Sequence, residues 1–172
     1  MRDHASFDAF YATTRARVLR QLTAMTASPE QAKDAVQEAY ERAWQRWARV
    51  SRLDDPEGWV RTVAWRVAVS SHRRAVVASR FLPRLWRERT TPVATDEVLD
   101  VQQALRRLRP EQRRALVLHH ICDRSVEEIA AETGVSVGTV KSRLSRGRAA
   151  LAKEIGPGYS TGAPVTVEEG RL

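Results

Sequence analysis

The side chains best suited to chemistry gather on a polar, basic stretch at residues 136–148. On a helix of about 100° per residue, the apolar positions of this stretch and the next turn share one face. These are Val140, Leu144 and Leu151. The remaining surface is small and polar or basic: Ser136, Gly138, Thr139, Lys141, Ser142, Arg143, Ser145, Arg146 and Arg148. Small residues let a helix enter the major groove of duplex DNA, and longer cations reach base edges and phosphates. The pattern favours a DNA-reading helix over a merely solvated basic face.

Signals before this stretch predict a helix-turn-helix within residues 110–151. Ser125 followed by Glu128 matches a capping box, which satisfies the free N–H groups at a helix start. Gly134 then permits a left-handed turn, and Ser136 is suited to cap the second helix. A helix, a short turn containing glycine and a second helix together form this motif.

Helix-start signals also recur through the rest of the chain, so we expect an all-α fold. Ser28 precedes Pro29 and Asp55 precedes Pro56, and each pair marks the start of a helix. Pro110 opens a further helix in the same way.

Prolines and threonines interrupt the helical pattern in the middle of the chain, which predicts two small helical domains. The first spans residues 5–75 and the second spans 96–155. Residues 76–95 are expected to form a flexible linker, and residues 156–172 a flexible tail. Because each domain is small, each core is marginal and binding partners can add stability.

The composition is that of a packed, basic chain. It has 172 residues, of which 42% are hydrophobic, and a formal net charge of +8. The apolar fraction is high enough for packed cores and argues against wholesale disorder. The positive charge attracts polyanions, among which nucleic acid is the commonest, although solubility alone is the simpler explanation.

No pattern in the sequence predicts catalysis, a cofactor or a metal site. The single cysteine, Cys122, cannot form an internal disulfide or build a zinc site by itself. His119 and His120 are neighbours that face apart on a helix. We find no signal peptide and no apolar run of the roughly 20 residues that a bilayer requires. We therefore expect a cytoplasmic protein that is not an enzyme and does not insert into membranes.

Three stretches of the second domain resemble region 4 of bacterial sigma factors. They are LRPEQRRAL at residues 108–116, SVEEIA at 125–130 and GVSVGTVKSRLSRGR at 134–148. In that family this region reads the minus-thirty-five promoter element. The last stretch alone also resembles the helix-turn-helix of response-regulator activators, which leaves the family open at this point.

A helix expected at residues 34–44 resembles the region 2 helix with which sigma factors bind the clamp helices of RNA polymerase. Its apolar face is formed by Ala35, Ala39, Ala43 and Trp44. Its polar, mostly acidic face carries the residues to which the resemblance assigns polymerase binding: Asp34, Gln37, Glu38 and Glu41. An ordinary amphipathic surface helix is the alternative.

Residues 56–64 resemble the segment with which region 2 recognises and melts the minus-ten element. Melting requires aromatic wedges against unpaired bases and cations along the strand. The candidates are Trp59, Arg61, Trp65, Arg66, Arg73 and Arg74. A place in the core is the alternative for each tryptophan, and we expect it for Trp44 and Trp47. Many members read Ala-Arg-Asn where this chain has Ala64, Trp65 and Arg66, which leaves the promoter sequence undetermined.

Two blocks in the right order identify the chain as resembling sigma factors of the extracytoplasmic-function group, with regions 2 and 4 only. The resemblance implies binding to core RNA polymerase, through its clamp helices and flap, and to promoter DNA. The resemblance also allows an anti-sigma factor as a further partner. It implies that the linker passes through polymerase, where its arginines can contact nucleic acid: Arg80, Arg84, Arg87 and Arg89. Two other functions remain open, a dimeric helix-turn-helix regulator that acts without a sigma role, and a protein-interaction module that has lost DNA binding.

Overall fold

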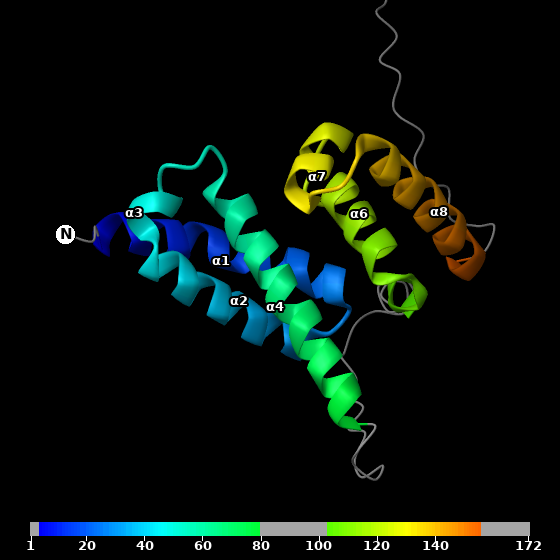
Figure 1. The fold of residues 1–172 in the computed structure, drawn as a ribbon, viewed down its shortest axis with the longest axis horizontal. Coiled ribbons are helices and arrows are strands. Elements are labelled where there is room, and N and C mark those ends of the chain that lie inside the picture. The colour runs from blue at the N-terminus through cyan, green and yellow to red at the C-terminus, as the bar shows by residue number, and fades with distance from the viewer. Residues whose placement is uncertain (1–3, 80–102, 156–172) are drawn as a thin grey trace, which may run out of the picture.

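The computed structural model describes residues 4–79 and 103–155, and within these ranges it contains helices and no strand (Figure 1). The first group of helices comprises α1 (His4–Thr26), α2 (Pro29–Gln45), α3 (Trp47–Val50) and α4 (Pro56–Ser79). The second comprises α6 (Pro110–His120), α7 (Val126–Thr133) and α8 (Val137–Ile155), and residues 103–107 are also helical. The all-α expectation is confirmed. Most of the expected linker, all of the tail and the linker arginines lie outside the described residues.

The predicted helix starts are present with their capping contacts. The Ser28 hydroxyl accepts from the backbone N–H of Gln31 at 3.4 Å, with Pro29 as the first residue of α2. Ahead of α4, the Asp55 carboxylate accepts from the N–H of Gly58 at 2.8 Å. These contacts satisfy N–H groups that the first turn of a helix leaves free.

The end of α4 differs from the prediction. The helix continues to Ser79, whereas the first domain was expected to end at residue 75. Residues 76–78 are Val, Val and Ala, none of which breaks a helix, and the first proline comes only at Pro83.

The core of the first group lies between α1, α2 and α4. Val18, Leu22 and Met25 of α1 are fully buried against the small residues of α2, such as Ala35 and Ala39. Small side chains let the helix axes approach closely, which explains the alanine spacing in α2. The predicted apolar face of α2 is therefore confirmed for Ala35, Ala39 and Ala43. Trp47 is buried as expected, but the expectation of a core position is wrong for Trp44, which is half-buried and lines an open groove between α1 and α2.

The second group packs α6 against α8, with α7 across one end. Leu118 of α6, Ile129 of α7 and Val140 and Leu144 of α8 are all buried. Gly134 joins α7 to α8 with a φ of 71°, a left-handed conformation that glycine adopts without strain. The predicted helix-turn-helix is thus present, and its first helix ends at Thr133 as expected.

Candidate nucleic-acid interface

The outward face of α8 presents most of the predicted DNA-reading side chains. The exposed members of the set are Ser136, Gly138, Lys141, Ser145, Arg146 and Arg148. Half-buried are Thr139, Ser142 and Arg143. The opposite face is closed by Val140, 1% exposed, and Leu144, 4% exposed, whereas Leu151 is half-buried. The structure therefore gathers the predicted set on α8 and its cap residue Ser136, with most members exposed to solvent, whereas Arg143 lines a cavity beside Trp65.

Two local features hold this helix in place. The Ser136 hydroxyl accepts from the backbone N–H of Thr139 at 3.2 Å and caps the start of the helix, as predicted. Gly147 lies against α6, where a Cβ atom would come within 3.1 Å of Leu116 Cδ1. Such close packing fixes how far the outward face projects from the domain.

The charge on this helix has one sign over most of its length, because no acidic residue lies between Val137 and Lys153. The Arg148 guanidinium approaches His120 Nε2 at 3.4 Å. Burial, followed by the nearby His119 and Arg148, lowers the pKa of His120. A neutral imidazole at physiological pH can accept from the arginine without opposing its charge.

On α2, the residues predicted to bind polymerase form one polar face. Asp34, Gln37 and Glu41 are exposed and Glu38 is half-buried. Gln37 donates to Glu41 at 3.1 Å, and Glu38 forms an ion pair with Arg42. Two carboxylates, Asp34 and Glu41, thus remain available to a basic partner on a rigid helix.

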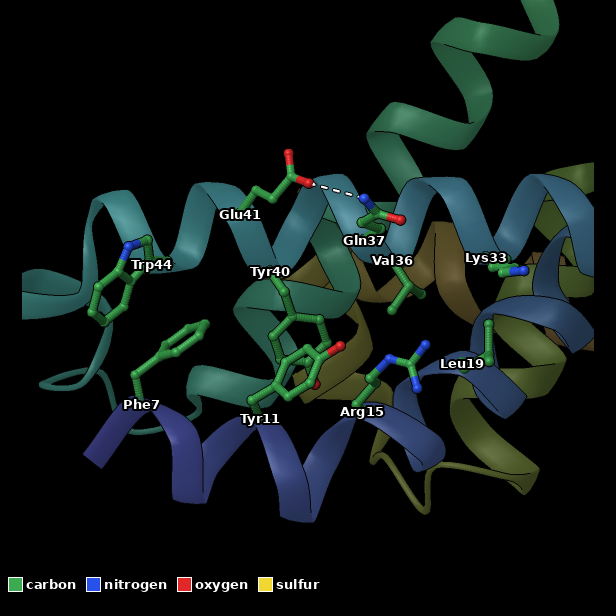
Figure 2. Close-up of a pocket in the computed structure, with 10 residues that line it drawn as sticks. All are labelled: Phe7, Tyr11, Arg15, Leu19, Lys33, Val36, Gln37, Tyr40, Glu41 and Trp44. Carbon is green, nitrogen blue, oxygen red and sulfur yellow. Dashed lines mark hydrogen bonds between the residues drawn. The ribbon is translucent and has the colours of Figure 1, made fainter. Parts of the chain in front are cut away.

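A groove between α1 and α2 borders this face (Figure 2) and was not predicted from the sequence. Its volume is about 350 Å³, and aromatic side chains line it. The Phe7 and Trp44 rings lie 5.0 Å apart, as do the Tyr11 and Tyr40 rings. Gln37 and Glu41 also line the groove. The aromatic spacing of four residues within each helix is the signal that could have revealed it.

The residues predicted to melt the minus-ten element do not form one surface. Arg66, Arg73 and Arg74 of α4 are exposed, and Trp59 is half-buried against the core. In contrast, Arg61 is only 1% exposed and Trp65 only 9%.

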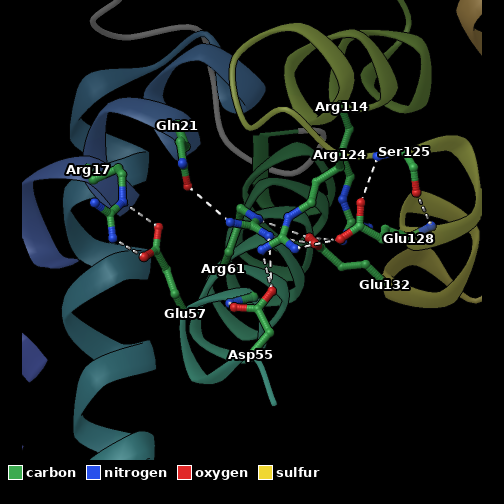
Figure 3. A network of polar contacts seen from close by, with 11 residues as sticks. Arg17, Gln21, Asp55, Glu57, Arg61, Arg114, Arg124, Ser125, Glu128 and Glu132 are labelled. Carbon is green, nitrogen blue, oxygen red and sulfur yellow. Dashed lines mark hydrogen bonds and ion pairs between the residues drawn. The ribbon is translucent and has the colours of Figure 1, made fainter. Parts of the chain in front are cut away.

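Arg61 lies where the two groups of helices meet (Figure 3), and Trp65 lines a cavity there with residues of the second group. Arg61 donates to the Glu132 carboxylate of α7 at 2.6 Å and 3.1 Å, and to Gln21 of α1 at 3.3 Å. Burial tends to lower the pKa of Arg61, but the hydrogen bonds and charge of Glu132 more than offset it, so the pKa is raised. Arg61 is therefore firmly protonated and fully engaged within the protein.

Further contacts continue this meeting surface, which we call the domain seam. Asp55, ahead of α4, forms an ion pair with Arg124, which precedes α7. Arg113 of α6 donates to the backbone carbonyls of Met25 and Thr26 at the end of α1. The ring of Trp65 faces the Arg114 guanidinium at 5.1 Å. None of these pairs was predicted, because their partners lie far apart in the sequence.

Comparison with known proteins identifies the family. The family described as Sigma-70 region 2 matches residues 10–76, and the family described as Sigma-70, region 4 matches residues 99–151. The RNA polymerase sigma-E factor of Streptomyces coelicolor is 30% identical over 156 residues, covering 87% of this chain and 85% of that protein. The ECF RNA polymerase sigma factor SigM of Mycobacterium tuberculosis is 32% identical over 168 residues, covering 90% and 79%.

A solved structure shows the same fold. It is the sigma factor RpoE from Bartonella quintana, in complex with the anti-sigma factor NepR, with a TM-score of 0.72 and 23% sequence identity. The match covers 87% of this chain and 96% of that one.

These matches define a class, the sigma factors of bacterial RNA polymerase. The chain belongs to the sigma-70 family and, within it, to the extracytoplasmic-function group matched in regions 2 and 4. It is an alternative sigma factor, which binds core polymerase and promoter DNA and directs promoter-specific initiation. Nothing in the comparisons favours the dimeric regulator. Across the residues that the structure describes, no helix is long and apolar enough to cross a membrane.

Proposed function

We propose that this sigma factor divides promoter recognition and polymerase binding among three surfaces of the chain. The outward face of α8 reads the minus-thirty-five element as duplex DNA. The polar face of α2 binds the clamp helices of core polymerase. The exposed basic side of α4 holds the minus-ten strand. Residues 5–75 and 96–155 act as the two functional domains, joined by the linker between them.

The single observation that carries this proposal is the sidedness of α8. Most of its polar and basic positions are exposed, including Lys141 and Arg146, while Val140 and Leu144 are buried. Gly138 and Ser145 have small side chains at the centre of the exposed face, so the helix backbone can approach the base edges in the major groove of DNA. Arg146 can take two acceptors of a guanine, and Lys141 is suited to a phosphate.

Polymerase binding is supported by the charge and rigidity of α2. Asp34 and Glu41 offer exposed carboxylates, and the aromatic groove beside Glu41 offers apolar area next to charge (Figure 2). A basic, amphipathic helix of a partner would satisfy both at once. We assign polymerase binding to Gln37 and Glu38 of the same face as well. The flap of polymerase would meet the second domain.

Minus-ten recognition is supported by the cations that α4 exposes. Arg66, Arg73 and Arg74 are exposed and can hold the sugar-phosphate backbone, and we assign support of an unstacked base to the half-buried Trp59. Arg61 and Trp65 belong to the same set by sequence, but they act only after the domain seam releases them.

We further propose that the chain works in the cytoplasm as a non-enzymatic subunit and is controlled by an anti-sigma factor. Its relatives are sigma factors, and the related RpoE was solved with the anti-sigma factor NepR. The basic charge of the chain, +8, suits a protein that must dwell near nucleic acid.

The test is transcription with purified core polymerase on a library of promoter fragments, with binding to core measured separately. Arg146→Ala should reduce initiation by roughly tenfold or more, because a base contact is worth about 1–3 kcal/mol. Binding to core should not change. Lys153→Ala is the matched control, since it removes a cation from the same helix outside the reading face. Failure of the unaltered chain to bind core would overturn the proposal.

A further inference from the structure

Two of the residues assigned to the minus-ten strand, Arg61 and Trp65, are closed off inside the domain seam. We propose that Glu132 is the latch of a closed state of the free chain, in which its carboxylate occupies Arg61 in place of a promoter phosphate. The inference rests on the proposed minus-ten role of α4. It adds a regulatory contact that holds that role back until the domains separate.

The geometry of Glu132 is that of a phosphate substitute. Its two carboxylate oxygens accept from Nε and NH2 of Arg61, which is the paired arrangement that a guanidinium also makes with phosphate. Both side chains are withdrawn from water, since Arg61 is 1% exposed and Glu132 is 11% exposed. A strand of DNA therefore cannot reach Arg61 without displacing Glu132.

Trp65 is closed off by the same contact surface. Its ring faces Arg114 and lines a small cavity together with Val135 and Arg143 of the second domain. A base can stack on this ring only if the second domain moves away. Release of Arg61 and release of Trp65 are therefore one event.

The closed state is weakened because a single carboxylate, that of Glu132, must balance the charge of two arginines. Glu132 hydrogen-bonds Arg61, and Arg114 is left at 3.7 Å from the same carboxylate. Nε and NH2 of Arg114 are buried without a hydrogen-bond partner. Burial lowers the pKa of Arg114 to about 10. A buried cation with two nitrogens that lack hydrogen bonds disfavours the closed state, so a polyanion that satisfies both arginines can compete with Glu132.

The polymerase-binding face is not involved in this closure. Asp34, Gln37 and Glu41 are exposed while the domain seam is shut. The clamp can therefore bind first, and capture of the minus-ten strand follows opening. This order keeps the free chain from holding single-stranded DNA before it has joined polymerase.

The first experiment measures domain separation in the full chain. Cys122→Ser removes the one native thiol, and Arg52→Cys with Ala149→Cys places one dye in each domain at an exposed position. In this background Glu132→Gln should lower energy transfer between the dyes. Glu127→Gln is the matched control, because it removes the same charge from an exposed position on the same helix.

The second experiment measures binding of the free chain to a fluorescein-labelled, mixed-sequence single-stranded DNA of twelve nucleotides. Glu132→Gln should tighten binding by about tenfold relative to Glu127→Gln, because apparent affinity scales with the fraction of competent molecules. Arg124→Gln breaks the ion pair to Asp55 and should also tighten binding. Loss of a positive charge would by itself weaken binding to DNA, so this variant separates release of the latch from simple electrostatics.

The outcomes distinguish the latch from the minus-ten assignment. Opening together with tighter binding in Glu132→Gln and Arg124→Gln supports the latch. Unchanged energy transfer in both variants overturns it, whatever the binding data show. Opening without any gain in binding to DNA overturns the minus-ten assignment of Arg61 and Trp65 instead. Circular dichroism of each variant establishes that it is folded, and Arg124→Gln provides the answer if Glu132→Gln is not.

Discussion

At the scale of single residues, the Arg114 guanidinium is buried without enough hydrogen-bond partners. It is buried in the domain seam, two of its nitrogens lack a hydrogen bond, and its pKa is lowered to about 10, chiefly by burial. The Trp65 ring, 5.1 Å away, offsets part of this cost through a cation–π interaction. A residue of similar length without charge would fill the same space at a lower desolvation cost.

We therefore expect Arg114→Met to stabilise the free chain. The gain should be about 1 kcal/mol, because the desolvation penalty of the guanidinium is larger than its cation–π attraction to Trp65. Denaturation in urea, with unchanged slope, measures it. Arg114→Ala is the comparison, and it should lower stability because it leaves a cavity. A methionine variant less stable than the unaltered chain would show that the guanidinium is a net stabiliser.

The site residues that could be predicted from the sequence are those whose exposure depends on their own helix. The exposed face of α8 follows from periodicity, because Val140 and Leu144 must be buried and the other side must then face outward. Arg61 was different. Its partner, Glu132, is 71 positions away, and no local pattern states which distant carboxylate an arginine will meet.

At the scale of elements, the packing of α8 on α6 decides how the reading face is presented. Gly147 is buried at this crossing, and the nearest atoms to an added Cβ would be Cδ1 and Cγ of Leu116, at 3.1 Å and 3.2 Å. Glycine in a helix interior normally costs about 1 kcal/mol relative to alanine, so its presence here reflects the close approach of the helices.

Gly147→Val should push α8 away from α6 and destabilise the second domain. Crowding of this kind costs about 1–3 kcal/mol, and the reading face would shift with the helix. Thermal unfolding followed by circular dichroism measures the loss. Ala149→Val provides the control, since the same β-branched residue at an exposed position of α8 should change stability little. Equal losses in both variants would argue that helix propensity, not packing, is responsible.

Helix boundaries were predictable where a side chain caps them. Ser28, Ser125 and Ser136 each bond a backbone N–H as expected, so the starts of α2, α7 and α8 followed from sequence. The end of α4 carries no such signal, and the helix ran to Ser79, past the predicted limit. Where no residue stops a helix, tertiary packing and chain entropy determine its length.

At the scale of the whole molecule, Arg113 ties the two groups of helices together through the main chain. Its guanidinium donates to the carbonyls of Met25 and Thr26, which end α1, and to the carbonyl of Leu105. A cation at the C-terminal end of a helix also interacts favourably with the helix dipole. Burial lowers the pKa of Arg113, yet all three of these carbonyls accept hydrogen bonds from it.

Arg113→Ala should loosen the attachment and destabilise the full chain by ~3 kcal/mol, because it leaves buried carbonyls without donors. Calorimetry should show a lower and broader transition as the two groups unfold less cooperatively. Arg107→Ala, which removes an exposed arginine that pairs with Glu154, should have little effect. A single, unshifted transition in the Arg113 variant would contradict the role proposed for this residue.

The contacts of Arg113 also bear on how this molecule can diverge. Met25 and Thr26 contribute only carbonyl oxygens to it, and every residue type carries the same oxygen. On the α1 side, the docking position of the two domains therefore depends on the main chain and is insensitive to side-chain substitutions at Met25 and Thr26. The pair of Glu132 and Arg61 has no such freedom, because it exists only while both side chains are retained. A single mutation at Glu132 or Arg61 would thus remove the latch and favour separated domains, while the contacts of Arg113 would still define where the domains meet when they dock.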